Sequence, residues 1–102
     1  MKKINIIETT LRDGSYAVNF AFTASDTFEI CRNLEDAGFE YIEIGHGVGL
    51  NANNSGYPVA AQSDEEYMIA AKKALRKAKY GMFCIPGIAR LEDINIAANH
   101  NM

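Results

Sequence analysis

Two neighbouring charged residues near the start of the chain are the first candidates for chemistry. Arg12 and Asp13 stand side by side in "TLRDGS", directly after an apolar run and before Gly14. A carboxylate is a preferred ligand of hard divalent cations, and arginine presents a planar fork of donors to a carboxylate or an oxyanion. The pair is either a surface ion pair at a strand end or a metal ligand beside an anion-stabilising group. The glycine, which permits a sharp turn, and the position after a strand favour the second interpretation.

A third charged residue, Glu43, lies inside the apolar segment "YIEIG" (41–45), where it alternates with Ile42 and Ile44. A carboxylate within a buried strand needs a hydrogen-bonding or charged partner. We predict that Arg12, on the adjacent strand, pairs with Glu43. The alternative is a glutamate exposed at the end of its strand.

The elements that must position these residues follow a repeated order. Short β-branched apolar runs predict strands over 3–8, 41–45 and 81–87. Capping-box spacing predicts helices that begin at Thr23 and at Ser63, and a third helix begins near Arg90 and Leu91. The apolar positions of the second helix extend to Ala78. This order, strand then helix three times over, predicts an α/β fold with a parallel βαβαβα sheet and right-handed crossovers.

This topology predicts where ligands bind. In parallel α/β folds the loops after the carboxyl ends of the strands carry the active site. The loops 11–24 and 46–62 are long, whereas the loops 37–40 and 77–80, which return from helices to strands, are short. Long loops on one face of a sheet are usually functional.

Composition excludes several classes of protein. The chain has 102 residues, is 48% apolar and 23% charged, and carries a net charge of −3, which is typical of one soluble domain. No run approaches 18 apolar residues and the basic residues of 72–80 are spaced as a solvated helix face, so we expect no membrane and no nucleic-acid partner. We expect a cytoplasmic protein in which Cys31 and Cys84 are buried, reduced thiols.

The motifs in combination carry a family resemblance. "TLRDG", the glutamate of "IEIG", "GHGVGL" and "IPGI" resemble the N-terminal part of the DRE-TIM metallolyases, the HMG-CoA lyase-like superfamily. The "HGxGL" variant is most similar to the branch that contains 4-hydroxy-2-oxovalerate aldolase. The resemblance covers nearly the whole chain. It implies that residues 1–102 are the first three units of a TIM (β/α)8 barrel, a fold of roughly 250 residues.

The resemblance also implies a reaction. It implies a divalent metal, Mn²⁺ or Mg²⁺, and cleavage or formation of a carbon–carbon bond of a small 2-oxo acid through a pyruvate-type enolate, with an aldehyde-using enzyme as a partner. Asp13 matches the family's metal-ligating aspartate, Arg12 the arginine that stabilises the enolate, and Glu43 the glutamate that orients this arginine. The family's further ligands, a His-x-His pair late in the barrel, have no counterpart here, so we expect the isolated 102-residue chain to be inactive.

One position departs from the family pattern. The proposed general base of the oxovalerate aldolases is a histidine three residues after the metal aspartate, and Tyr16 stands at that position. A phenol titrates near pH ~10 and is a poor base at neutral pH. His46 is an available imidazole on the same rim. It either takes part in catalysis or packs between glycines with its nitrogens bonded to backbone.

Two alternatives to an aldolase remain: an acetyl-CoA-dependent Claisen enzyme of the same superfamily, and a non-catalytic α/β module used for assembly. A three-stranded sheet has open edges and an uncovered face, so we expect self-association, or ordering within the remainder of a barrel, and no stable monomer. The helices are expected to point six side chains inward: Phe28, Cys31, Leu34, Tyr67, Ala71 and Leu75. Six apolar strand residues should divide between the two sheet faces: Ile4, Ile6, Ile42, Ile44, Phe83 and Ile85.

Overall fold

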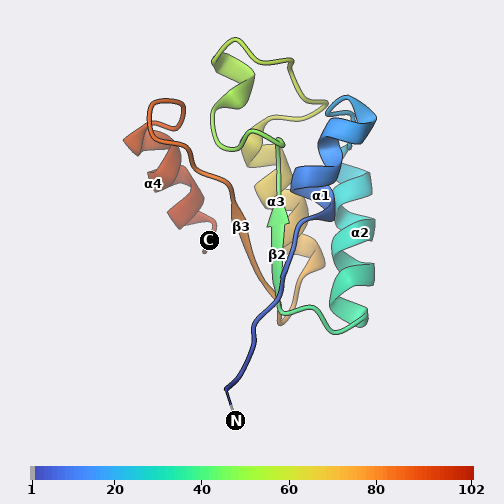
Figure 1. Ribbon diagram of the computed structural model, residues 1–102. Helices are drawn as coiled ribbons and strands as arrows, with labels where there is room; N and C mark the ends of the chain where they lie inside the picture. Colours follow the sequence, from blue (N-terminus) through green and yellow to red (C-terminus); the bar gives the residue numbers. More distant parts are fainter. Residues whose placement is uncertain (1) are drawn as a thin grey trace.

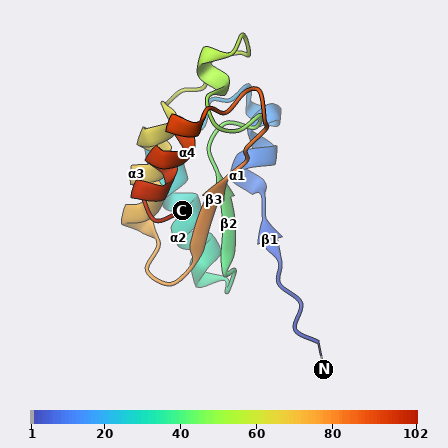
Figure 2. The ribbon, with the colours of Figure 1, turned by 90° about the vertical axis from the view of Figure 1, so that its left-hand side faces the viewer.

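Three short parallel strands form the centre of the computed structural model, which describes residues 2–102. Strand β1 (Ile7–Glu8), β2 (Tyr41–Ile44) and β3 (Lys79–Met82) lie in the order β1-β2-β3. The register places Tyr41 beside both Ile7 and Lys79. Figure 2 shows β2 between its two neighbours, with the segment before β1 extending away from the body. The predicted α/β fold with a parallel sheet is confirmed.

Helices connect the strands and cover one side of the sheet (Figure 1). Strand β1 leads into α1 (Thr10–Asp13) and the 3-10 helix η1 (Gly14–Val18), and α2 (Ala24–Asp36) then returns to β2. A long loop containing η2 (Ala52–Asn54) precedes α3 (Asp64–Ala74), and β3 is followed by α4 (Leu91–Asn99). The loop expected after β1 is therefore largely helical.

Local sequence determines where the two long helices begin. Thr23 accepts a hydrogen bond from the backbone N–H of Asp26, whose side chain accepts one from the Thr23 N–H. Ser63 and Glu66 form the same reciprocal pair at the start of α3. Both predicted capping boxes are confirmed. Each satisfies two of the backbone donors that a helix N-terminus leaves unpaired.

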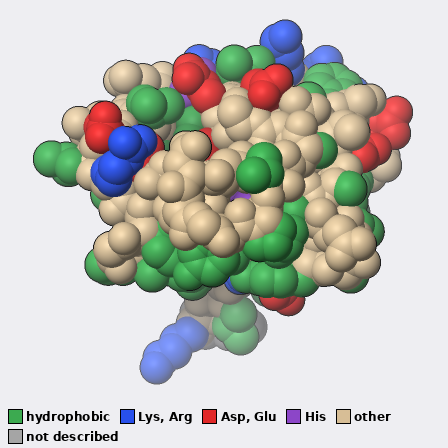
Figure 3. Space-filling view, turned by 90° about the horizontal axis from the view of Figure 1, so that it is seen from above, with side chains coloured by type: hydrophobic (Ala, Val, Ile, Leu, Met, Phe, Trp, Pro, Cys, Tyr) green, Lys and Arg blue, Asp and Glu red, His purple; other side chains and the backbone are tan. Residues whose placement is uncertain are grey.

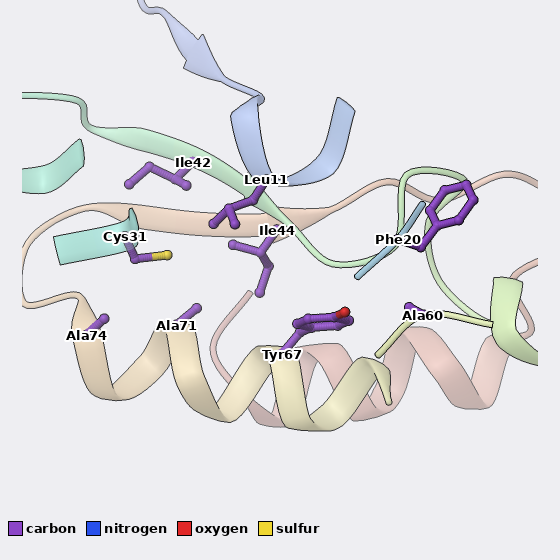
Figure 4. Packing of buried hydrophobic residues seen from close by; sticks show 9 residues of the cluster. All are labelled: Leu11, Phe20, Cys31, Ile42, Ile44, Ala60, Tyr67, Ala71 and Ala74. Atoms are coloured by element: carbon purple, nitrogen blue, oxygen red, sulfur yellow. The ribbon is translucent and has the colours of Figure 1, made fainter. Parts of the chain in front are cut away.

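The hydrophobic core lies between β2 and the two helices α2 and α3. Ile42 and Ile44 are almost fully buried and contact a cluster to which Cys31 from α2 and Tyr67 from α3 contribute. Figure 4 shows Tyr67, with the alanines of α3, directed towards the isoleucines of β2. Because side chains alternate along a strand, Glu43 lies on the opposite face of the sheet. That face would point into the interior of a barrel.

Three expectations about the outer parts of the core are wrong. Strand β1 begins only at Ile7, because its pairing partner β2 begins at Tyr41, so Ile4 and Ile6 lie outside the sheet and are 84% and 62% exposed. Phe28 points outward from α2 and contacts Arg32 rather than the core. Both cysteines are free thiols; Cys31 is buried as expected, whereas Cys84 follows β3 and is exposed.

The third strand and the helix before it are also displaced from their predicted positions. Helix α3 ends at Ala74 rather than near Ala78, because the carboxylate of Glu35 accepts the backbone N–H groups of residues 76–78. Those three donors would otherwise continue the helix. The chain is then free to pair with β2 from Lys79 onwards, so β3 covers 79–82 instead of 81–87.

Candidate functional site

Helix α1 places Arg12 and Asp13 at the carboxyl end of β1. Leu11 is buried in the core and fixes the orientation of this short helix. The Arg12 side chain, which follows it, is only 18% exposed, whereas the Asp13 carboxylate is 68% exposed. Arg12 therefore lies on a helix rather than on the strand where it was expected. The two charges differ in environment: the arginine is held within the protein and the aspartate faces solvent.

The Arg12 guanidinium is held by segments that follow all three strands. Its Nη2 lies 3.4 Å from Oε1 of Glu43 on β2, which confirms the predicted pair. Its Nη1 donates to the carbonyl of Gly47 over 3.5 Å and lies 3.7 Å from Oδ1 of Asp13. The guanidinium carbon lies 4.7 Å from the centre of the Phe83 ring, in cation–π geometry. These contacts leave the guanidinium few orientations, which suits a group that must meet a developing negative charge.

His46 is buried, and backbone groups occupy both of its ring nitrogens. The carbonyl of Pro58 lies 2.7 Å from Nε2, so Nε2 carries the proton and Nδ1 accepts the N–H of Val48 at 3.0 Å. The ring stacks on Phe20 with centroids 4.2 Å apart. This arrangement corresponds to the structural alternative for His46. Proton transfer by this residue would require one of its two backbone hydrogen bonds to open.

Tyr16 lies on η1 at the same rim and is half exposed. Its ring meets Phe20 edge to face at 5.1 Å and covers Gly47. Figure 3 views this end of the molecule, where small groups of hydrophobic side chains alternate with polar side chains and backbone. The structure thus brings Arg12, Asp13, Glu43 and Tyr16 to one rim, and His46 is buried against Phe20, the ring that Tyr16 contacts.

A feature missed at the level of sequence is the network around Asn51. This residue has a φ of 67°; its N–H donates to Asp64 Oδ2 at 2.7 Å and its side chain donates to the carbonyl of Ile88. Burial raises the pKa of Asp64, the bond from Asn51 lowers it, and nearby Asp93 raises it further. The sequence held one signal that could have pointed to this network: asparagine tolerates a left-handed backbone conformation better than most residues do. The network joins the loops after β2 and β3.

A hollow of about 550 Å³ adjoins this network rather than the Arg12 pair. Its walls include Asp64 and Arg90, but neither Arg12 nor Asp13. Volume alone would place a ligand there. We place the candidate site at Arg12, because charged groups from different segments converge at that point.

Of the two carboxylates that pair with Arg12, that of Asp13 is the exposed one and is open to a cation from solvent. Its exposure fits a role as one oxygen ligand of Mn²⁺ or Mg²⁺. Within residues 2–102, no three side chains of His, Cys, Asp or Glu are grouped so that they would hold a metal ion. Across the same residues, no helix is both long and apolar enough to cross a membrane.

Comparison with known proteins gives a consistent result. The chain is 45% identical over 95 residues to an oxaloacetate decarboxylase of Mycobacterium tuberculosis, covering 93% of this chain and 28% of that protein. It is also 45% identical over 98 residues to a 4-hydroxy-2-oxovalerate aldolase of Moorella thermoacetica and 42% identical over 97 residues to one of Carboxydothermus hydrogenoformans. Those matches cover 96% and 95% of this chain, and 29% of each relative. The chain therefore spans less than a third of the length of these relatives.

Residues 3–101 match the sequence model of the HMGL-like family. The open sheet of three parallel strands is consistent with the start of the TIM-barrel-like fold that the sequence predicted. Family match, related sequences and strand topology agree, and the chain belongs to the HMGL-like family.

Proposed function

We propose that the full-length protein is a divalent-metal-dependent aldolase or lyase that cleaves or forms a carbon–carbon bond of a small 2-oxo acid through a pyruvate-type enolate. The observation that carries this proposal is the fixed Arg12 fork, held between Glu43 and the Gly47 carbonyl beside an exposed Asp13. The relatives named as 4-hydroxy-2-oxovalerate aldolases support it.

Each residue has a distinct role in the proposed reaction. Arg12 donates hydrogen bonds to the oxygen that becomes negative as the enolate forms, and Glu43 keeps the guanidinium in place. Asp13 would hold the divalent cation, together with ligands from outside this chain. When bound, Mn²⁺ or Mg²⁺ polarises the carbonyl of the 2-oxo acid.

Tyr16 and His46 complete the proposed site. The half-exposed phenol of Tyr16 is a hydrogen-bond donor at the rim, suited to hold or deliver a proton rather than to remove one at neutral pH. His46 supports the loop that carries Gly47 through its bonds to Pro58 and Val48. If His46 were instead the base, replacing it would remove the acidic limb of the pH profile of kcat/KM. If it only supports the loop, the profile keeps its shape.

The test is an assay of the full-length protein with Mn²⁺ for pyruvate release from a 4-hydroxy-2-oxo acid. We expect Arg12→Ala and Asp13→Asn each to lower kcat by about 100-fold or more, as loss of a transition-state contact does. Arg32→Ala is the matched control, because Arg32 lies on α2 against Phe28, away from the rim. Unchanged activity in Arg12→Ala or Asp13→Asn contradicts the proposal.

A second candidate reaction is decarboxylation of a 2-oxo diacid, and Tyr16 is the observation that favours it. Cleavage of a 4-hydroxy-2-oxo acid needs a base to remove the hydroxyl proton, whereas loss of CO₂ does not. The carboxylate attached to the carbon beside the carbonyl leaves as CO₂. The electron pair of the broken bond stays on that carbon, which then takes up a proton. One related protein is named oxaloacetate decarboxylase. The test gives the full-length protein oxaloacetate and, separately, the 4-hydroxy-2-oxo acid, with Arg12→Ala as the background control. Decarboxylation is supported if the wild type forms more pyruvate from oxaloacetate than Arg12→Ala does and forms none from the hydroxy acid.

Further arms of the same assay separate the remaining alternatives. Thiol release from acetyl-CoA with a 2-oxo acid would favour a Claisen condensation. Absence of turnover with all of these substrates and either metal would favour a non-catalytic assembly module. The proposal also includes a cytoplasmic location and an aldehyde-using partner enzyme, because an aldolase cleavage releases an aldehyde that another enzyme must consume. Co-purification of an aldehyde-oxidising activity with the tagged full-length protein tests that partner.

A further inference from the structure

We propose that Gly47 is a positioning residue for Arg12: its lack of a side chain lets the Tyr16 turn close against the loop, which brings the Gly47 carbonyl to the guanidinium. The inference rests on the proposed function, in which Arg12 stabilises the enolate. It adds a residue that holds Nη1 of the arginine, whereas Glu43 holds Nη2.

The space around Gly47 is too small for a side chain unless Tyr16 and Ser15 move. Gly47 is buried, and a Cβ atom at this position would lie 2.5 Å from Cε2 of Tyr16 and 2.7 Å from Oγ of Ser15. Carbon atoms normally approach no closer than about 3.5 Å. Gly45 and Gly49, on either side, have positive φ angles, whereas Gly47 does not. Position 47 thus needs glycine for room alone, since its backbone conformation is open to other residues.

The same few residues connect this close approach to Arg12. The Gly47 carbonyl accepts from Nη1 of Arg12 over 3.5 Å, and the Ser15 hydroxyl donates to the Arg12 carbonyl at 2.7 Å. Ser15 and Tyr16 follow Arg12 within one continuous helical turn. A side chain at 47 would press on this turn, and the turn carries the arginine with it.

The loop around Gly47 cannot easily move, because the residues on both sides of the glycine are held in place. His46 precedes Gly47 and is fixed by Pro58 and by stacking on Phe20, while Val48 follows it and donates to His46. The displacement caused by a larger residue therefore falls on Tyr16 and on Ser15, and the buried Ser15, which is bonded to the Arg12 carbonyl, passes it to the turn. We expect the separation of Arg12 from both Glu43 and the residue-47 carbonyl to increase.

The first test compares Gly47→Ala with Gly14→Ala in the full-length protein. Gly14 has an ordinary helical φ of −66°, and a Cβ there would come no closer than 3.9 Å to Thr10, so it is a matched control beside the site. Misplacement of a group that acts mainly in the transition state lowers kcat more than it changes KM. We expect Gly47→Ala to lower kcat by roughly 10-fold or more with KM within about 3-fold. Gly14→Ala should leave both unchanged, and a kcat of Gly47→Ala near wild type overturns the proposal.

The second test removes the larger part of the obstruction, the Tyr16 ring. In the double variant Gly47→Ala/Tyr16→Ala, two of the three close contacts at position 47 are gone. Substitutions at residues that act on one another have non-additive effects. We therefore expect the kcat of the double variant to be higher than the value obtained by multiplying the fold-losses of the two single variants. If Gly47→Ala alone does not fold, the double variant should recover folding. Independent effects, or a double variant that also fails to fold, contradict the proposal.

The third test does not depend on activity. Arginine side-chain NMR of the full-length protein, with Arg12→Lys to assign the signals, reports rotation of the guanidinium. We expect the Arg12 Nη signals to show restricted rotation in the wild type and in Gly14→Ala, and free rotation in Gly47→Ala. Equal restriction in all three overturns the positioning role. If the wild type turns over no 2-oxo acid yet shows this difference, the proposed function fails while the positioning inference stands.

Discussion

Nη2 of Arg12 lies 3.4 Å from Oε1 of Glu43, although the two residues are 31 positions apart. The contact joins the helix that follows β1 to the middle of β2. Both side chains are mostly buried, at 18% and 21% exposure, so the Glu43 carboxylate depends on Arg12 for compensation, while Arg12 has Glu43 and the exposed Asp13. The pair is therefore both a structural link and the means by which the arginine is directed at the rim.

We predict that Glu43→Gln lowers the free energy of unfolding of this chain by about 1–3 kcal/mol, because it leaves the largely buried Arg12 guanidinium with only the solvent-exposed Asp13 carboxylate, 3.7 Å away, as a counter-ion. A urea titration measures the change. The control is Glu40→Gln. Glu40 pairs with Lys3 at 3.9 Å, and both side chains are exposed. We expect this substitution to change the free energy of unfolding by less than about 1 kcal/mol. Equal effects of the two substitutions would show that the buried pair contributes no more to stability than the exposed pair.

Glu35 makes stability depend on pH. Its carboxylate accepts backbone N–H groups from Ala78 and Lys77, and these bonds lower its pKa below the ordinary 4.5. A carboxylate whose pKa is lower in the folded state stabilises the fold above its unfolded pKa, and loses this effect as the pH falls through the folded value. We expect the wild type to lose more stability than Glu35→Gln on acidification from pH 6 to below about 4. Denaturant titrations at several pH values measure this.

The Glu35 comparison has an internal control. Glu29 lies on the same helix and is exposed, so Glu29→Gln should retain the pH dependence of the wild type. The Glu35 assignment fails if Glu29→Gln and Glu35→Gln respond to acid alike.

The two cysteines should react at very different rates. Cys31 is fully buried, and burial, with a contribution from Glu35, raises its thiol pKa to about 12. Cys84 is exposed. Because the thiolate is the reactive form, we expect Ellman's reagent at pH 8 to modify one thiol in the native chain and two in guanidinium. Cys84→Ser should abolish the native reaction. Rapid modification of both thiols without denaturant would mean that the core opens readily.

The exposed isoleucines before and within β1 predict self-association of the 102-residue chain. Ile7 lies on the edge strand β1, Ile4 and Ile6 lie in the segment before it, and each of the three is more than 60% exposed. An unpaired edge with apolar side chains is a template for pairing with another chain. We expect sedimentation velocity to show concentration-dependent association at micromolar concentrations, and Ile4→Lys/Ile6→Lys to weaken it. A cooperative monomer with native isoleucines would contradict this prediction.

What the sequence by itself determined was mostly local. The capping boxes of Thr23 and Ser63 satisfy helix donors within three residues, so a short stretch of sequence contains the whole interaction. The alternation of Glu43 with Ile42 and Ile44 was likewise visible in the sequence, whereas the structure decided that the two isoleucines face the helices. The arginine–glutamate pair was predictable because a charge within an apolar strand needs a partner and few candidates lie nearby.

Tertiary structure alone decided the features that depend on distant residues. Helix α3 ends early because Glu35, about 40 positions away, accepts the donors that would extend it. His46 is a packed residue because Pro58 and Phe20 reach it from separate loops, which no local pattern encodes. Gly47 needs to be glycine because Tyr16 lies against it. In each case the deciding contact forms only after the chain has brought remote segments together.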